Sequence, residues 1–309
     1  MVAGALLAAT ALPRDAAAQA GGDVPDWLAT HVGDGPGQIS AVVLDRARAL
    51  HARKAAEGAV SNPCYMAMDA TRPNDPGDGD AGGRFYVICE GQQSFSAIPS
   101  GHGSGRNLGA AANFSNGRRC ARNFGNAQDS ELTTGGGYVT GEIRTSFKGY
   151  YRTGSGPVAF SRAFIPFEGE GETANAKARE IGGHAAVTLK NLCLRKAPDD
   201  PHANAEGYVV FGNLVDYAGG RSNGCTSWSS TDAAELGALT RDNPTTLYIY
   251  PEAADIRAAG RGAYWNASCL REIGAPHYWS RAALEPVIAR FKREHPAPPP
   301  RPLPLCTGG

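Results

Sequence analysis

The stretch Gly220-Arg-Ser-Asn-Gly-Cys-Thr-Ser-Trp228 places Cys225 in a loop of small residues that is followed by a helix-start signal. A cysteine is nucleophilic only as a thiolate, and free N–H groups at a turn before a helix lower a thiol pKa and can hold an oxyanion. This loop therefore predicts a reactive thiol. The alternative is that Cys225 is half of a structural disulfide.

The cysteine count favours a reactive thiol. The chain has seven cysteines, so in an oxidising compartment six can pair and one is left over. We expect the unpaired one to be Cys225. The sequence contains no C-x-x-C pair and no Cys/His cluster with zinc spacing, so we expect neither a metal ion nor a cofactor.

The composition indicates a globular protein with many loops and short strands. Of the 309 residues 42% are hydrophobic, and the chain contains 40 glycines and 21 prolines. Lys and Arg together number 30, as do Asp and Glu, so the formal net charge is zero. Nothing in this balance favours a nucleic acid or an anionic membrane surface as a partner, and we expect a monomer.

The first residues resemble an export signal. Residues 1–12 form an apolar run as long as the hydrophobic region of a signal peptide, and Ala18-Gln19-Ala20 offers a small-x-small cleavage site. No other segment approaches the ~20 apolar residues that a membrane helix needs. The sequence predicts a signal peptide over residues 1–20 and an exported protein without a membrane span.

The patterns predict a mainly β, α+β protein with helices at both ends. We expect helices over 39–56 and 174–181, another begun by a capping box of Asp232 and Glu235, and an amphipathic helix around 284–291. A strand hairpin is expected over 84–89 and 94–98, with further short strands within 134–141 and 147–164 and strands at 184–189, 208–211 and 245–250. Residues 191–204 are polar and contain proline, which predicts an inserted loop.

These elements divide the chain after the signal peptide into four parts. They are an N-terminal helical region and loop (21–83), a catalytic domain (84–252), a C-terminal helical region (253–295) and a Pro-rich tail (296–309).

Catalysis by a cysteine needs a base, and two of the histidines are candidates. His102 and His184 are flanked by glycines and small residues, as a closely packed site requires. The other five lie in the leader region, on polar helix faces, in a loop or in an aromatic cluster.

Several motifs resemble a known family. Gly182-Gly-His-Ala185 followed by Arg221-Ser-Asn-Gly-Cys225 is similar to the His…Ser-x-Gly-Cys signature of YkuD-type L,D-transpeptidases, which cross-link peptidoglycan. Ser100-Gly-His-Gly-Ser-Gly105, Phe114-Ser-Asn116 and Gly136-Gly-Tyr-Val-Thr-Gly141 resemble motifs of the branch called murein L,D-transpeptidase catalytic-domain-like. The resemblance spans about residues 84–252 and implies a YkuD-like β-sandwich catalytic domain in the periplasm.

The resemblance also implies roles for individual residues. Cys225 would attack the carbonyl of an L-centre followed by a D-residue and form a thioester, with His184 taking the thiol proton. The N–H groups of Asn223, Gly224 and Cys225 would hold the oxyanion. Further residues would contact substrate: His102, Arg106, Tyr138, Arg221, Ser222 and Thr226. Ser-Trp after Thr226 replaces the aliphatic-Arg pair that is common in the family, so Arg221 or Arg106 is expected to contact the substrate carboxylate.

Three functions remain open at this point. The first is transfer of the acyl group of a stem peptide to the side-chain amine of diaminopimelate. The insertion and the tail resemble those of a branch that makes 1-3 cross-links, so we expect these ahead of 3-3 cross-links. The second is hydrolysis by the same residues as an L,D-carboxypeptidase or endopeptidase. The third is a non-catalytic cell-wall binding module in which Cys225 forms a disulfide.

The Pro-rich tail is expected to form a strap at the cleft. Its prolines fix the backbone and leave little entropy to lose, so residues 296–305 can lie along a groove at small cost. Cys306 would anchor its end, most simply to Cys269.

Overall fold

The structure, a computed structural model, describes residues 23–77, 82–218 and 220–307. The signal peptide expected over residues 1–20 lies outside these ranges. None of the helices in the described ranges is long and apolar enough to cross a membrane.

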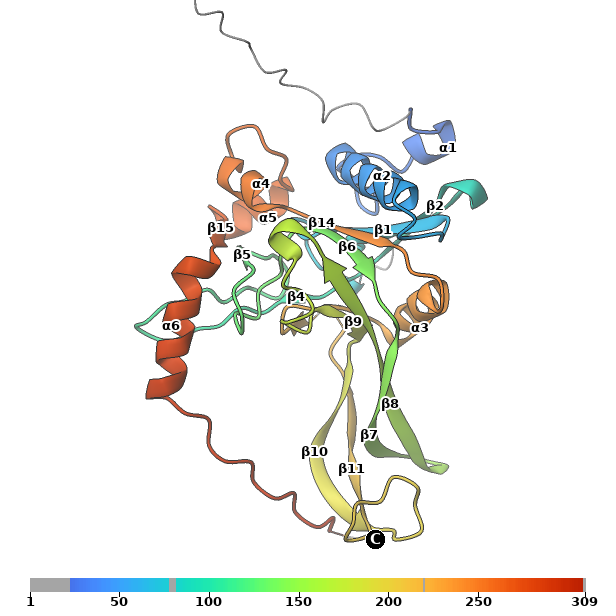
Figure 1. Ribbon diagram of the computed structural model, residues 1–309, viewed down its shortest axis with the longest axis vertical. Coiled ribbons are helices and arrows are strands. Elements are labelled where there is room, and N and C mark those ends of the chain that lie inside the picture. The colour runs from blue at the N-terminus through green and yellow to red at the C-terminus, as the bar shows by residue number, and fades with distance from the viewer. Residues whose placement is uncertain (1–22, 78–81, 219, 308–309) are drawn as a thin grey trace, which may run out of the picture.

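A mixed sheet of 11 strands organises the described part of the chain (Figure 1). Its main path runs β10-β11-β7-β8-β6-β14-β1-β2-β3, and β9 pairs with both β8 and β13. The main-path strands, in chain order, are β1 Cys64–Asp69, β2 Phe85–Cys89, β3 Ser94–Ile98, β6 Gly136–Thr140, β7 Arg144–Thr153, β8 Gly156–Gly169, β10 Val187–Lys196, β11 Tyr208–Asp216 and β14 Thr246–Tyr250. The expected mainly β, α+β architecture is confirmed.

Short strands and helices complete the structure. The remaining strands are β4 His102–Gly103, β5 Asn123–Gly125, β9 Gly182–Ala185, β12 Arg221–Ser222, β13 Thr226–Trp228 and β15 His277–Trp279. The α-helices are α1 Asp26–Ala29, α2 Ala41–Ala56, α3 Ser230–Thr240, α4 Ala253–Ala258, α5 Ala267–Ile273 and α6 Arg281–Glu294, and short 3-10 turns occur at Glu90–Gln92 and Gly171–Thr173.

The centre of the sheet is covered on both faces. Side chains alternate along a strand, so Tyr65 and Ala67 of β1 face one side while Met66 and Met68 face the other. The first pair packs in the core that includes α2, and the second packs in the core that includes Trp228. Figure 1 shows α2 lying across one face of the sheet beside β1 and β14.

Strand β1 was not expected from the sequence. All six of its residues are buried, so it lacks the alternation of polar and apolar residues that identifies a half-exposed strand. It runs parallel to β14 and antiparallel to β2. A strand from the region 21–83 therefore lies in the sheet between two strands of the region 84–252.

Four long strands, β7, β8, β10 and β11, extend away from the rest of the molecule and form what we call the arm (Figure 1). The loop expected over 191–204 is wrong in its first part, because β10 extends to Lys196 and its residues 193–196 pair with β11 after an irregularity between Lys190 and Cys193. This hairpin is solvated over much of its surface, so its strands are nearly as polar as a loop.

The helix expected over 174–181 is also wrong. This segment is a series of turns. Asn175 donates from its side-chain amide to the carbonyl of Asn126, and Arg179 donates to the carbonyl of Leu132. Tertiary hydrogen bonds therefore hold this segment, and its helix-forming composition does not decide its structure.

Three disulfides join the six cysteines other than Cys225. They are Cys64–Cys89, Cys120–Cys269 and Cys193–Cys306. The expectation that Cys225 is the unpaired cysteine is confirmed. Such a set is compatible with an exported protein.

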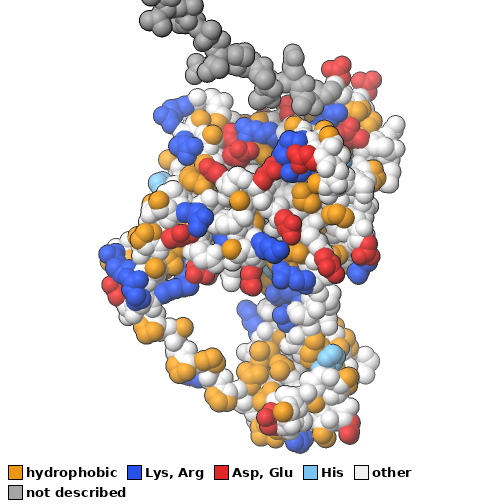
Figure 2. Space-filling view, viewed as in Figure 1, with side chains coloured by type: hydrophobic (Ala, Val, Ile, Leu, Met, Phe, Trp, Pro, Cys, Tyr) orange, Lys and Arg blue, Asp and Glu red, His pale blue; other side chains and the backbone are white. Residues whose placement is uncertain are grey.

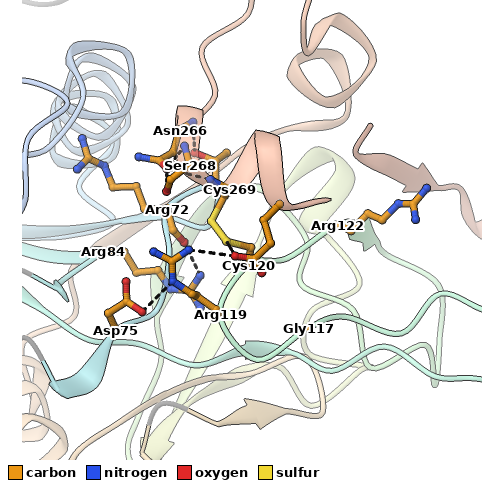
Figure 3. Close-up of a disulfide and its surroundings, with 12 residues drawn as sticks. Arg72, Asp75, Arg84, Gly117, Arg119, Cys120, Arg122, Asn266, Ser268 and Cys269 are labelled. Carbon is orange, nitrogen blue, oxygen red and sulfur yellow. Dashed lines mark hydrogen bonds and ion pairs between the residues drawn. A yellow bond between two sulfur atoms is a disulfide. The ribbon is translucent and has the colours of Figure 1, made fainter. Parts of the chain in front are cut away.

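The pairing expected between Cys306 and Cys269 is wrong. Figure 3 shows Cys269 of α5 bonded to Cys120, beside the ion pair of Arg119 with Asp75. Cys306 lies elsewhere because the tail leaves the end of α6 and runs to the arm (Figure 1). Closeness in sequence to Cys269 therefore did not predict the partner of Cys306.

The tail forms a strap between α6 and the arm. Its end is held by backbone hydrogen bonds from the N–H of Leu194 to the carbonyl of Pro304 and from the N–H of Cys306 to the carbonyl of Leu194. The Cys193–Cys306 bond closes the strap. Figure 2 shows an open space between the tail and the arm that no side chain fills.

Replacing both Cys193 and Cys306 by serine is expected to release the strap while the rest of the fold persists. The amide of Leu194 should then exchange its hydrogen faster, because its acceptor lies in the tail. Hydrogen exchange measured by mass spectrometry tests this expectation.

The matched control replaces both Cys120 and Cys269, which are 1% and 0% exposed. Loss of this buried bond should cost about 2–5 kcal/mol of unfolding free energy. An equal or larger drop in Tm for the strap variant would contradict the expectation that the strap is a separable element.

Candidate active site

Cys225 lies at the wall of an open cleft of about 690 Å³. The cleft is formed where the arm meets the loop that carries the cysteine. Its lining residues are Arg144, Ser146, Lys148, Arg162, Phe164, Arg179, Glu180, His184, Thr188, Tyr217, Arg221, Ser222, Asn223 and Cys225.

The parallel pairing of β9 with β13 brings His184 and Cys225 to the same place. Ser227 is the register partner of His184, and paired residues share one face of a sheet. Cys225 precedes Ser227 by two residues, so it lies on that face as well. Both side chains line the cleft.

The loop before Cys225 has a conformation that requires glycine. Gly224 has φ +103°, and a Cβ there would come within 3.0 Å of Ile181 and 3.1 Å of the carbonyl oxygen of Leu132. The hydroxyl of Ser222 donates to the carbonyl of Cys225 and closes the turn. Among the described residues, the N–H groups of Asn223, Gly224 and Cys225 have no acceptor, so they are available as donors.

The thiol of Cys225 is protonated at neutral pH. Burial raises its pKa above the ordinary value, and the backbone of Gly182 and the positive charges of Arg179 and Arg162 offset this only in part. The S–H group contacts the carbonyl of Glu180 at 3.6 Å.

The expected lowering of the thiol pKa by a helix N-terminus is therefore wrong. Strand β13 separates Cys225 from α3, whose N-cap is Ser229, and the Ser229 hydroxyl accepts from the N–H of Asp232. Asp232 consequently lies within the helix and does not begin it with a capping box.

His184 has one nitrogen engaged and the other free. Its Nδ1 donates to the carbonyl of Ala185 at 2.8 Å, which leaves Nε2 as the nitrogen that can accept a proton. Burial lowers the pKa of His184, and the nearby Arg162 lowers it further. The imidazole is therefore neutral at pH 7. The structure contains no direct hydrogen bond between His184 and Cys225.

His102 is not a cleft residue. It is 0% exposed, with Nδ1 accepting from Arg84 at 2.6 Å and Nε2 donating to the carbonyl of Gly117 at 3.0 Å. Burial holds its pKa well below the ordinary value. Its strand β4 pairs with β12, so His102 supports the loop that leads to Cys225.

The other residues expected to contact substrate divide into two groups. Arg221 and Ser222 line the cleft. Tyr138 and Thr226 are each 2% exposed and do not line it, because their side chains belong to the interior. Arg106 lies outside the cleft and donates to the carbonyl of Asp129, so of the two expected carboxylate contacts only Arg221 is at the site.

The sequence did not identify the cations of the arm and of the 174–181 turns as site residues. Arg144 and Lys148 lie on β7, Arg162 lies on β8, and Arg179 lies in the turns. The alternation of Arg144 and Ser146 on β7 was a usable signal, since both would share one face of a strand. The sequence pattern did not predict which face of β7 lies toward Cys225.

Across the described ranges, no three His, Cys, Asp or Glu side chains gather as a metal site requires. The cleft therefore offers a thiol, an imidazole, free backbone donors and several cations.

We expect the rate at which iodoacetamide alkylates Cys225 to keep rising from about pH 6 to beyond about pH 9, because burial keeps the thiol protonated. Mass spectrometry of the alkylated protein gives the rate. The Cys225→Ser protein should take up no label, since the other six cysteines are paired. A plateau near neutral pH would instead indicate a preformed thiolate–imidazolium pair.

No family model matches the sequence, and neither the curated proteins nor the solved structures include a chain with significant similarity to it.

Proposed function

We propose that the protein is a cysteine acyltransferase of the YkuD L,D-transpeptidase type that acts on peptidoglycan stem peptides. One observation carries this proposal. The unpaired cysteine lies in an open cleft beside a histidine whose Nε2 is free, and strand pairing fixes both positions. A cysteine with a purely structural role would need neither a histidine beside it nor a place in the lining of a cleft.

The proposed reaction begins with the neutral thiol and the neutral imidazole. As the sulfur of Cys225 attacks the peptide carbonyl carbon, Nε2 of His184 takes the thiol proton. The N–H groups of Asn223, Gly224 and Cys225 hold the oxygen that becomes negative, a contribution of about 3–4 kcal/mol for one donor in other enzymes. The imidazolium then gives its proton to the departing amine, which leaves a thioester.

The second half of the reaction restores the enzyme. A side-chain amine of diaminopimelate attacks the thioester carbonyl, and His184 takes a proton from that amine. The C–S bond breaks, the sulfur leaves and is protonated, and a new amide bond links two stem peptides. The resemblance of the insertion and the Pro-rich tail to those of a branch that makes 1-3 cross-links supports 1-3 products ahead of 3-3 products. The three disulfides support the periplasm as the compartment.

The two other functions differ in what the same cleft would do. Hydrolysis would use water in place of the acceptor amine, and the open cleft admits water. The binding-module hypothesis placed Cys225 in a disulfide, but this thiol is unpaired. That observation favours an enzyme over a binding module.

Incubation of purified protein with peptidoglycan, followed by muropeptide analysis, tests the proposal. We expect new cross-linked products from the parent protein and a loss of at least about 1,000-fold in the Cys225→Ser variant, because a serine hydroxyl in this setting is not ionised by one histidine. Shortened stems without cross-links would indicate the hydrolase. Full activity of the variant would rule out Cys225 as the nucleophile.

His184→Ala and His102→Ala are expected to fail in different ways. The first should lower the rate about 100- to 10,000-fold with little change in Tm, because it removes the base. The second should cost about 1–3 kcal/mol of unfolding free energy, since it leaves a buried donor of Arg84 without its acceptor. Steady-state rates and thermal unfolding separate the two. The assignment of the base would be overturned if His102→Ala gave the larger rate loss at an unchanged Tm.

A further inference from the structure

Three cations of the arm face the cleft from two adjacent strands. Arg144 and Ser146 share one face of β7, and Arg162 on β8 is the register partner of Ser146. Lys148 is the extra residue where the register of β7 and β8 shifts between Phe147 and Gly149. A bulge redirects a side chain, and Lys148 lines the cleft with the two arginines.

None of these three cations is neutralised by the protein. No carboxylate among the described residues forms an ion pair with Arg144, Lys148 or Arg162. Arg144 instead lies over the ring of Phe164, with its guanidinium carbon 5.1 Å from the ring centroid. Of the described residues that line the cleft, only Glu180 is acidic.

Arg162 has hydrogen-bonding capacity to spare. One of its terminal nitrogens donates to the carbonyl of Val187 at 2.5 Å, which fixes the direction of the side chain. Its Nε is buried without an acceptor. Arg162 also lines the cleft, so its guanidinium can interact with an anion there, and a hydrogen bond between two charged groups is stronger than one between neutral groups.

The positive charge is local to the cleft. The whole chain has a formal net charge of zero, yet the cleft lining contains Arg179 and Arg221 as well as the three arm cations. Figure 2 shows Lys and Arg side chains gathered where the arm meets the body, beside the open space under the tail. A cleft in which positive side chains outnumber negative ones concentrates anionic ligands.

The spacing of the cations fits an extended peptide. Alternate residues of a strand are about 7 Å apart, and alternate groups of an extended peptide repeat at the same distance. Arg162 of β8 pairs with Ser146, so the levels of Arg144, Arg162 and Lys148 follow one another along the arm in steps of about two residues, or about 7 Å. Phe164 pairs with both Arg144 and His184, so a chain laid along β7 away from His184 brings successive acidic groups past the three cations. We call these three residues the cation track.

We infer that the cation track binds the free carboxylates of an extended acidic peptide and so holds its reactive carbonyl at Cys225. This inference rests on the proposed function, because it takes Cys225 as the point of attack. It specifies the substrate class further: the peptide must carry unmodified carboxylates, and a peptide with amidated carboxylates is a poor ligand. The tail is attached to β10 and none of its residues lines the cleft.

Binding to the Cys225→Ser protein tests the track without turnover. The probe is the stem peptide L-Ala-γ-D-Glu-meso-diaminopimelate-D-Ala, with its carboxylates free or with the D-Glu and diaminopimelate carboxylates amidated. Isothermal titration calorimetry gives Kd for both. We expect Lys148→Gln, Arg144→Gln and Arg162→Gln each to weaken binding of the free peptide about 10-fold or more, since a hydrogen bond to a charged group is lost.

Lys190→Gln is the matched control. Lys190 is an exposed cation on β10 of the same arm and does not line the cleft. It should leave Kd unchanged, and the three track variants should bind the amidated peptide as the parent does. Lys148 is exposed and forms no ion pair, so Lys148→Gln tests the track even if Arg162→Gln disturbs folding through Val187.

The outcomes separate the track from the proposed function. The track would be overturned by equal affinity for the free and amidated peptides, or by equal losses of affinity for the free peptide in Lys148→Gln and Lys190→Gln. Either result would hold regardless of the reaction that the parent protein catalyses. If the peptide binds through the track but the protein with intact Cys225 forms no thioester, the proposed function fails and the binding site stands. Two results together support both the track and the proposed function. The protein with intact Cys225 forms a thioester, and the three track variants, but not Lys190→Gln, bind the free peptide more weakly.

Discussion

The contact between Trp228 and Gly183 determines whether the candidate site can form. A Cβ on residue 183 would come within 2.0 Å of the Trp228 ring, so only glycine lets the indole lie there. This close approach allows β13 to pair with β9, and that pairing sets the positions of Cys225 and His184. Trp228 also packs against Phe85 in the core, with ring centroids 5.0 Å apart. The packing of Trp228 in the core and the positions of Cys225 and His184 in the site therefore depend on each other.

A buried arginine supports the same site from the other side. Arg84 is 0% exposed, and it donates to the carbonyls of Ser100 and Arg72 and to Nδ1 of His102. Burial lowers its pKa to about 10, so it stays charged at neutral pH. Three acceptors offset much of the cost of burying this charge. They also fix the segment 100–103, which pairs with the strand just before the loop of Cys225.

Sequence patterns predicted the elements whose signals are local. Helix α2, strands β2 and β3 and helix α6 were expected close to where they lie, because periodic apolar residues and flanking turns define them. Glycines beside a histidine indicate close packing, but they do not show whether the histidine lies in the core or in an active site. At His102 they reflect structural packing, as a Cβ on Gly101 would come within 2.3 Å of the Ser227 hydroxyl. The same signal at His184 marked a cleft residue.

What the sequence did not predict depends on contacts between distant segments. Strand β1 shows no alternation because both its faces are buried, and the turns over 174–181 follow tertiary hydrogen bonds. The partner of Cys306 depends on the path of the tail to the arm, which no local pattern encodes. The alternation of residues could place the cations of β7 and β8 on one face of a strand. Which face lies toward Cys225 depends on how the arm folds against the loop of Cys225, and the sequence did not predict that.

The charge of the cleft and the protonation of the thiol are connected. The positive charges of Arg179 and Arg162 favour a thiolate, yet burial outweighs them and raises the pKa of Cys225, so its thiol is protonated at neutral pH. An acidic ligand on the cation track would neutralise part of that positive charge and exclude water from the cleft, and both changes further disfavour a free thiolate. The nucleophile must then lose its proton during the attack itself. A neutral base beside the thiol is therefore needed most when the cleft is occupied, and the lowered pKa of His184 keeps its imidazole neutral for that step.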